Sequence, residues 1–311
     1  MLHLLKKGLN VDDASFNLMY PAPLASSGAK VKENFAANIF SVTRQLRYSK
    51  ANPLQEIDMV LFINGIPLIT LELKNHWTGQ TARYHGQKQY REDRDISQPL
   101  LQFGRCLVHM AVDTEEVYMT TKLAGKGTFF LPFNKGNNHG QGNPPNTLFD
   151  GTGGHKTSYL WREVFSKESL ANIIQHFVRL DGSSKDDLKK RTLFFPRYHQ
   201  MDVVRKLIAH ASTNGVGQTY LIQHSAGSGK SNSITWAAYQ LIEAYPLSGN
   251  IPGSKGTDQP LFDSVIVVTD RRLLDKQLRD NIKEFSEVKN IVAPAFKSSE
   301  LKSALENGKK S

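Results

Sequence analysis

The sequence predicts an α/β protein of two domains, with strands and a hairpin in the first half of the chain and a parallel α/β sheet in the second. Two apolar runs, residues 57–63 and 66–74, flank an Asn-Gly step, which is a strong hairpin pattern. Further along, short apolar runs alternate with helical segments, as in a parallel α/β sheet. The length of 311 residues is typical of about two domains.

The elements of the first half follow from the spacing of apolar residues. Apolar and β-branched residues predict a strand at 40–46, before the hairpin, and a polar, helical pattern follows the hairpin over 78–98. Further strands are expected at 106–113, 116–121 and 128–133. Residues 134–146 lack a large apolar side chain and predict a loop, whereas 158–180 predicts an amphipathic helix that begins near Ser166.

The second half alternates between strand and helix. Helical spacing at 198–211 is followed by a short strand at 219–223, a glycine-containing loop and a helix at 231–244. The run VIVVT at 265–269 predicts a buried strand, and 271–285 predicts a helix. The expected boundaries are therefore a strand-rich domain at 1–165, a helical linker at 166–192 and an α/β domain at 193–311.

Charge and cysteine content narrow the function classes. The formal net charge is +10 at pH 7, which favours a polyanionic partner such as DNA or RNA. The single cysteine, Cys106, excludes an internal disulfide and fits a reducing, cytoplasmic compartment. No run of about 18 apolar residues occurs, so no membrane span is expected.

A phosphate-binding loop is predicted between the run TYLIQ and a helix, at Gly227, Ser228, Gly229, Lys230 and Ser231. Glycines let backbone N–H groups turn inward, and the helix N-terminus adds positive potential. Lys230 is expected to reach the β- and γ-phosphates of ATP, and the Ser231 hydroxyl to ligate Mg²⁺. The full pattern requires glycine where this chain has His224, so a chance Gly-Lys-Ser turn is the alternative.

Two residues upstream of the loop suggest adenine recognition. The Tyr198 ring is able to stack on adenine, and the Gln200 amide is able to pair with its donor and acceptor edge. This pair resembles the adenine-reading glutamine motif of superfamily 2 helicases. The alternative is a helix start at which Gln200 is merely solvated.

Three charged residues interrupt the apolar hairpin. Asp58 begins one predicted strand, and Glu72 and Lys74 lie two residues apart on the next, hence on one face. Unpaired buried charge is costly, and a divalent metal would offset that cost. Two carboxylates and the Leu73 carbonyl are able to hold Mg²⁺, with Lys74 orienting or activating the attacking water. The alternative is a half-exposed hairpin with Glu72 and Lys74 on its wet face.

The hairpin register decides whether these residues meet. A two-residue loop at the Asn-Gly step, carried down a regular ladder, would turn Asp58 away from Glu72. A three-residue loop, with Phe62 opposite Ile66, would bring the two carboxylates to one face. We therefore predict a three-residue loop or an equivalent bulge.

Together these segments resemble a known family. The spacing Asp58-x13-Glu72-x-Lys74 resembles the PD-(D/E)xK nuclease superfamily. The stretch TRQLRYSKANPLQEIDMVLFINGIPLITLELKN looks like the nuclease core of the type I restriction R subunit, and AGSGKSNSI and VIVVTDRRLLDKQL resemble motifs I and Ia of its helicase motor. Tyr90 fits the Gln-x3-Tyr element of that family, but Gly86 stands at the glutamine position.

The resemblance implies a PD-(D/E)xK mixed-sheet nuclease domain followed by a partial RecA-like P-loop domain. It implies that Asp58, Glu72 and Lys74 cleave unmodified double-stranded DNA with Mg²⁺, and that ATP drives translocation. Tyr90 is then a candidate DNA contact. The implied partners are the modification (M) and specificity (S) subunits, through which S-adenosylmethionine acts and the DNA target is chosen.

Two alternatives stay open. No Asp-Glu-x-His motif follows Ser231, so we expect a fragment of a longer subunit, and a fragment that only binds DNA or nucleotide is one alternative. The other alternative is a repair-type helicase-nuclease. In this chain the predicted nuclease precedes the predicted motor, which favours the restriction subunit.

Overall fold

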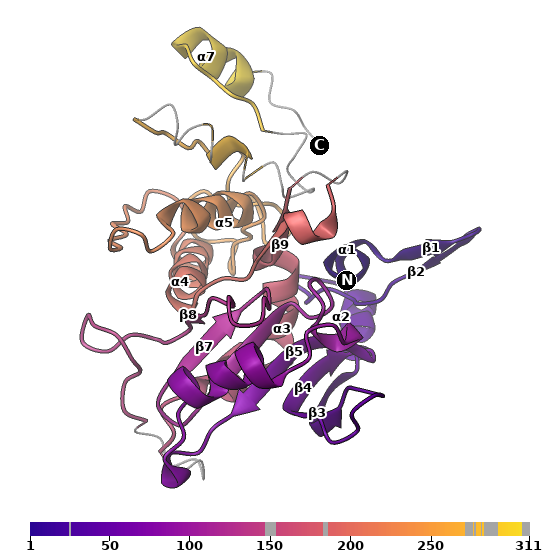
Figure 1. The fold of residues 1–311 in the computed structure, drawn as a ribbon. Coiled ribbons are helices and arrows are strands. Elements are labelled where there is room, and N and C mark those ends of the chain that lie inside the picture. Colours follow the sequence, from indigo (N-terminus) through magenta and orange to yellow (C-terminus); the bar gives the residue numbers. More distant parts are fainter. Residues whose placement is uncertain are drawn as a thin grey trace. The chain divides into compact units, whose positions relative to one another are not determined.

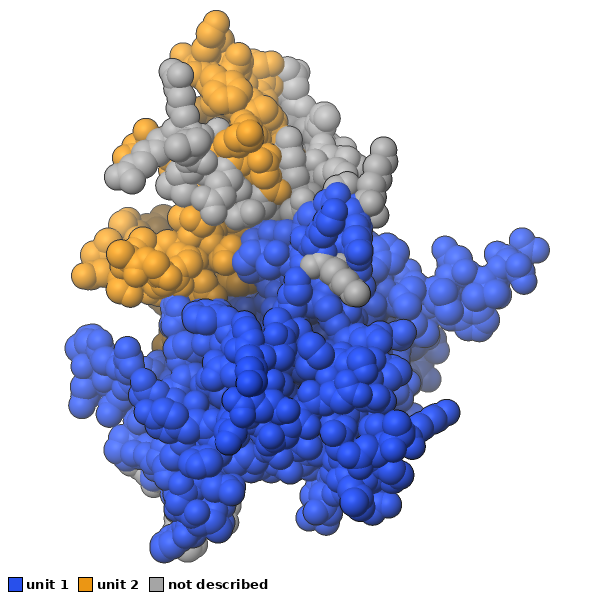
Figure 2. All heavy atoms as spheres, in the orientation of Figure 1, with its two compact units in different colours: residues 1–199 blue, residues 200–311 orange. Residues whose placement is uncertain are grey.

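The computed structural model describes residues 1–24, 26–146, 154–182, 186–270, 276, 278–280, 282 and 292–306. The chain forms two compact units, Met1–His199 and Gln200–Ser311, which Figure 2 shows in different colours. Each unit is described by itself below. Among the described residues, no helix is both long and apolar enough to cross a bilayer.

A six-stranded mixed sheet is the centre of the first unit, with the order β3-β4-β5-β6-β7-β8 (Figure 1). β5 and β6 are parallel, and the other neighbours are antiparallel. The strands are β3 (Phe40–Arg47), β4 (Glu56–Ile63), β5 (Ile66–Leu73), β6 (Val108–Val112), β7 (Val117–Thr120) and β8 (Leu131–Pro132). The strands expected in the first half of the sequence are confirmed, with shifted ends. The mixed α/β fold class is thereby confirmed for this unit.

A helical crossover joins the two parallel strands, as parallel pairing requires. It contains η1 (His76–Thr78), η2 (Ala82–Gly86), η3 (Gln89–Asp93) and η4 (Pro99–Leu101). η2 packs on β5, β6 and β7. Gly86 permits this close approach, because a Cβ on Gly86 would lie 2.8 Å from the Cβ of Ala111 on β6. The position where the family element has glutamine is thus a packing contact in this chain.

The β4–β5 hairpin has a two-residue loop, so the three-residue loop predicted from the sequence is wrong. Ile63 pairs with Ile66, and Asn64 and Gly65 both have positive φ, 48° and 78°, as a type I′ turn requires. The predicted alternative, an equivalent bulge, is confirmed. The register shifts beyond Phe62, which leaves Leu68 of β5 without a partner in the ladder.

This bulge brings Asp58 and Glu72 to the same face of the sheet. Val60 pairs with Thr70 and Met59 with Leu71, so continuing the register places Asp58 level with Glu72. The three-residue loop, with Phe62 opposite Ile66, would instead place Asp58 opposite Thr70. The bulge shifts the ladder in the other direction and brings the two carboxylates closer than expected.

Smaller elements complete the first unit. They are α1 (Leu2–Lys7), β1 (Leu9–Val11), β2 (Ala14–Phe16), α2 (Ala29–Ala36), η5 (Leu160–Val164), α3 (Lys167–Asn172), η6 (Ile173–Phe177), β9 (Arg179–Asp181), η7 (Leu188–Lys190) and β10 (Thr192–Phe194). Ser166 caps α3 by accepting the Ser169 N–H, so the predicted helix start is confirmed. The segment 134–146 contains only an isolated bridge, as expected for a loop.

The second unit differs from the predicted parallel sheet. The helices α4 (Tyr198–Asn214), α5 (Lys230–Ile242) and α7 (Ser298–Glu306) are present. The predicted strands at 219–223 and 265–269 do not form, and Leu221 and Val268 are 92% and 86% exposed. An apolar run becomes a strand only where another strand supplies its hydrogen bonds, and neither run has such a neighbour among the described residues. Most of the predicted helix at 271–285 lies outside the described residues.

Candidate functional site

Asp58 and Lys74 meet at one end of the β4–β5 hairpin. The Lys74 Nζ lies 3.6 Å from Asp58 Oδ2. The same carboxylate oxygen accepts the backbone N–H of Leu73 at 2.7 Å, where the recorded ladder between the two strands has ended at the Met59–Leu71 pair. The Asp58 carboxylate therefore accepts the hydrogen bond that a backbone carbonyl of β4 would otherwise accept, and this bond holds it against β5, the strand that carries Glu72.

Glu72 is the most buried of the three predicted cleavage residues, with an exposed fraction of 0%. Arg94, which directly follows η3, donates from Nε to Glu72 Oε1 at 2.7 Å. The other oxygen, Oε2, is buried without a hydrogen-bond partner. A buried, unbonded carboxylate oxygen carries a desolvation cost, which a cation at this point would offset.

The electrostatics of Glu72 reflect three opposing influences. The pKa of Glu72 is raised to about 7: burial raises it most, the Arg94 guanidinium lowers it, and the nearby Asp58 carboxyl raises it to a smaller extent. An ion pair by itself would hold the pKa of a carboxyl below its usual range. Desolvation outweighs the pair here, because Glu72 has no exposed surface.

A buried polar network lies on the same face of β5. Thr70 Oγ1 is 2.8 Å from the Tyr90 hydroxyl and 2.7 Å from His109 Nδ1. Tyr90 is 0% exposed and packs in the core with Ile57 and Val60. The DNA contact suggested for Tyr90 from the sequence is therefore contradicted by its burial, because a ring without accessible surface supports the sheet rather than a ligand.

The donor set fits a metal with few protein ligands. In the described ranges, no group of three or more His, Cys, Asp or Glu side chains is placed to hold a metal. Asp58 and Glu72 supply two carboxylates, and the predicted third ligand is the Leu73 carbonyl. Mg²⁺ is commonly bound through one or two carboxylates and keeps several waters. The unbonded Glu72 Oε2 therefore suits this ion.

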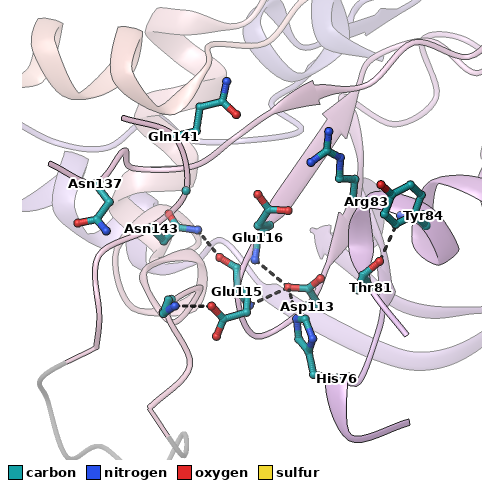
Figure 3. A pocket seen from close by; sticks show the side chains of 12 residues that line it. His76, Thr81, Arg83, Tyr84, Asp113, Glu115, Glu116, Asn137, Gln141 and Asn143 are labelled. Atoms are coloured by element: carbon teal, nitrogen blue, oxygen red, sulfur yellow. Dashed lines mark hydrogen bonds and ion pairs between the residues drawn. The ribbon is translucent and has the colours of Figure 1, made fainter. Parts of the chain in front are cut away.

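A separate pocket of about 370 Å³ opens near the ends of β5 and β6 (Figure 3). Its wall includes Asp113, whose carboxylate accepts N–H groups of Ala82, Glu115 and Glu116 and lies 3.4 Å from His76 Nε2. Asp58, Glu72 and Lys74 do not line this pocket. Asp113 thus anchors the start of η2 and the β6–β7 turn.

In the second unit, the predicted phosphate loop lies at the start of α5. Gly227 and Gly229 have φ values of 72° and 82°, which favour glycine, and Gly229 is the N-cap of the helix. Lys230 Nζ donates to the carbonyl oxygens of His224 and Ser225, each at 2.9 Å. The lysine thus lies across its own loop, and Ser231 is in the first turn of the helix.

The two predicted adenine-reading residues have other contacts. Gln200 Nε2 donates to the carbonyls of Ser228 and Gly229, each at 3.1 Å, so this amide nitrogen stabilises the loop. Tyr198 is 8% exposed and packs edge-on against Phe133 and Tyr159 in the first unit. These contacts give the Tyr198 ring a packing role in the first unit, and its stacking on adenine stays a prediction.

Sequence reasoning missed Arg94, Thr70 and His109. Arg94 lies four residues after Tyr90, which is a helical repeat, and that spacing was the available signal. No local pattern marks Thr70 and His109, because they become neighbours only through the parallel pairing of β5 and β6.

Comparisons with known proteins match both units. The model for the N terminus of the type I restriction enzyme R protein matches residues 24–128, and the SWI2/SNF2 ATPase model matches residues 199–311. A putative type I restriction enzyme MjaVIIIP endonuclease subunit of Methanocaldococcus jannaschii is 25% identical over 257 residues, covering 80% of this chain and 22% of that protein. The type I restriction enzyme HindI endonuclease subunit of Haemophilus influenzae is 24% identical over 262 residues. That alignment covers 84% of this chain and 22% of the relative.

The matches agree in order with the two units of the structure. The chain spans 22% to 23% of the length of the curated relatives it matches. Residues 24–128 thus resemble the N terminus of type I restriction enzyme R proteins, and residues 199–311 resemble a SWI2/SNF2 ATPase.

Proposed function

We propose that the first unit is a PD-(D/E)xK-type, Mg²⁺-dependent nuclease domain that cleaves unmodified double-stranded DNA. The observation that carries this proposal is the convergence of Asp58, Glu72 and Lys74 at one end of β4 and β5, with Glu72 Oε2 buried and unbonded. The alternative, a half-exposed hairpin with Glu72 on its solvent-facing side, does not agree with the 0% exposure of this glutamate.

Each residue has a distinct task in this proposal. Glu72 and Asp58, with the Leu73 carbonyl, would hold the ion, which supplies Lewis-acid stabilisation of the charge that develops on the scissile phosphate. The Lys74 ammonium, only 9% exposed and close to Asp58, orients the attacking water or the phosphate. The Leu73 N–H holds the Asp58 carboxylate in place.

The second unit is proposed to bind Mg-ATP for DNA translocation. The loop 227–231 precedes a helix of 13 residues, whose N-terminus favours phosphate. Lys230 would exchange its two loop carbonyls for the β- and γ-phosphates, and Ser231 would ligate Mg²⁺. Gln200 then supports the loop carbonyls in place of the adenine contact expected from the sequence.

The whole enzyme is proposed to act in the cytoplasm as a complex. Curated relatives are named as endonuclease subunits of type I restriction enzymes, and we extend that role to this chain. M and S subunits would then be its partners, with S-adenosylmethionine acting through them and DNA as the substrate. The net charge of +10 agrees with a polyanionic substrate.

The test uses the assembled restriction complex and a plasmid that carries an unmodified target. Asp58→Ala and Lys74→Ala should each abolish cleavage while leaving DNA-dependent ATP hydrolysis intact. Lys30→Ala, in an exposed Lys30–Glu33 pair of α2, is the control and should cleave normally. Normal cleavage by either site variant would overturn the nuclease assignment.

A further inference from the structure

Arg94 makes an unusually buried contact with the proposed metal site. The side chains of Arg94 and Glu72 are 8% and 0% exposed, and the Nε–Oε1 distance is 2.7 Å. Arginine binds carboxylates through fixed, directional donors, so this contact determines which way the carboxylate faces. With Oε1 engaged, Oε2 is the oxygen that stays unbonded.

We propose that Arg94 is a positioning residue that fixes Glu72 to present one oxygen, Oε2, to a single divalent cation. This inference rests on the metal site proposed above. It predicts that Glu72 binds the ion through one oxygen, the mode that an ion of near-octahedral geometry accepts readily. A second ion at Oε1 would have to displace the guanidinium.

Charge balance supports a single ion. Asp58 and Glu72 contribute two negative charges when ionised, and Lys74 and Arg94 contribute two positive charges, so the four groups sum to zero. One divalent ion gives the cluster two positive charges, which suits a phosphodiester. A second ion would add repulsion among four cationic centres in a poorly solvated place.

The competing explanation is that Arg94 only fastens the end of η3 to the sheet. Arg91 offers a matched comparison, because it lies in η3, which Arg94 directly follows, and it donates from Nε to the Thr128 carbonyl at 3.0 Å. Arg91 therefore has a comparable tethering bond, but to backbone instead of a site carboxylate. A purely mechanical role would make the two arginines equivalent in metal binding.

The experiment measures Mn²⁺ binding by calorimetry on the 311-residue chain without DNA or nucleotide. The proteins compared are the wild type, Glu72→Gln, Arg94→Gln, Arg94→Lys and Arg91→Gln, each checked for folding by circular dichroism. We expect the wild type to have one Mn²⁺ site that Glu72→Gln removes. Arg94→Gln should weaken that site by about tenfold to a hundredfold, Arg94→Lys should weaken it by less, and Arg91→Gln should leave it unchanged.

Several results would overturn the inference. Mn²⁺ affinity of Arg94→Gln equal to or tighter than that of the wild type would exclude a positioning role, and two Glu72-dependent ions would exclude the single-ion site. Where Arg94→Gln fails to fold, Arg94→Lys decides, because wild-type affinity there would show that the guanidinium contact is dispensable. If Glu72→Gln removes no Mn²⁺ site, the proposed nuclease site itself fails, which is a different outcome.

Discussion

Acidification should remove a stabilising contribution that His109 makes to the first unit. This histidine lies in β6 and is 1% exposed. Burial lowers the pKa of His109 from 6.5 to about 4. Thr70 shares a hydrogen bond with its Nδ1, so the neutral ring has a partner in the fold. The substitution His109→Gln removes the titration while keeping a polar side chain.

The sign follows from the depressed pKa of the folded state. Below pH 6.5 the His109 side chain binds a proton in the unfolded chain but not in the folded chain. The contribution of His109 to the free energy of unfolding is therefore present above that pH and is lost as the pH falls toward 4. A difference of about 2.5 pKa units lowers the free energy of unfolding by about 3 kcal/mol over the whole titration of His109. Between pH 7 and pH 5 the loss is about 2 kcal/mol.

Glu72 acts in the opposite sense and with similar size. Its pKa is raised from 4.5 to about 7, so the folded chain holds a proton that the unfolded chain releases. That contribution is fully present below pH 4.5 and is lost as the pH rises through 7. Between pH 7 and pH 5 it adds about 2 kcal/mol, which nearly offsets the loss caused by His109.

The measurement is hydrogen exchange of peptides from β5 and β6, compared at pH 7 and pH 5 after correction for the intrinsic exchange rate. Relative to the wild type, His109→Gln should gain about 2 kcal/mol of opening free energy on acidification, and Glu72→Gln should lose about 2 kcal/mol. The control is His3→Gln, an exposed residue of α1 that is in water in both states. A His109→Gln profile that parallels the wild type would refute this reasoning.

Three further outcomes are expected. Gly86→Gln, which restores the family glutamine, should lower the free energy of unfolding by about 1–3 kcal/mol in a thermal scan because its Cβ would meet Ala111, and the double variant with Ala111→Gly should recover part of it. Gly229→Ala, at φ 82° and with its Cβ 2.3 Å from Gln200 Nε2, should weaken binding of a fluorescent ATP analogue by at least about fivefold, a cost of about 1 kcal/mol, and unchanged binding would contradict the loop geometry. The 311-residue chain alone should release no phosphate from ATP above background, and DNA-stimulated turnover that Lys230→Ala abolishes would disprove this.

The sequence predicted local structure well where one side-chain pattern corresponds to one element. The apolar runs of β4 and β5 and the helical stretch of the crossover are visible in the chain because burial on one face imposes a period on the residues. The type I′ turn at the Asn-Gly step also has a local cause, since both residues tolerate positive φ, but the three-residue loop predicted there was wrong.

The bulge in β5 is an intermediate case. Its position next to Pro67 had a local signal, because proline lacks an N–H and disturbs the ladder of a central strand. The sequence pattern required some change of register to bring Asp58 to Glu72, but it did not favour a bulge over a longer loop. The pairing of whole strands decided between them.

The sequence by itself determined the mixed α/β character of the first unit, the hairpin with its charged residues and the glycine loop before α5. Only the tertiary structure decided that Arg94 pairs with Glu72, that Tyr90 is a core residue and that Tyr198 packs in an aromatic cluster. The physical reason is that the spacing of apolar residues shows which face of its element a residue lies on, whereas the side chains that it contacts on that face come from distant segments. The run at 219–223 shows the same limit, because a strand exists only when another strand completes its hydrogen bonds.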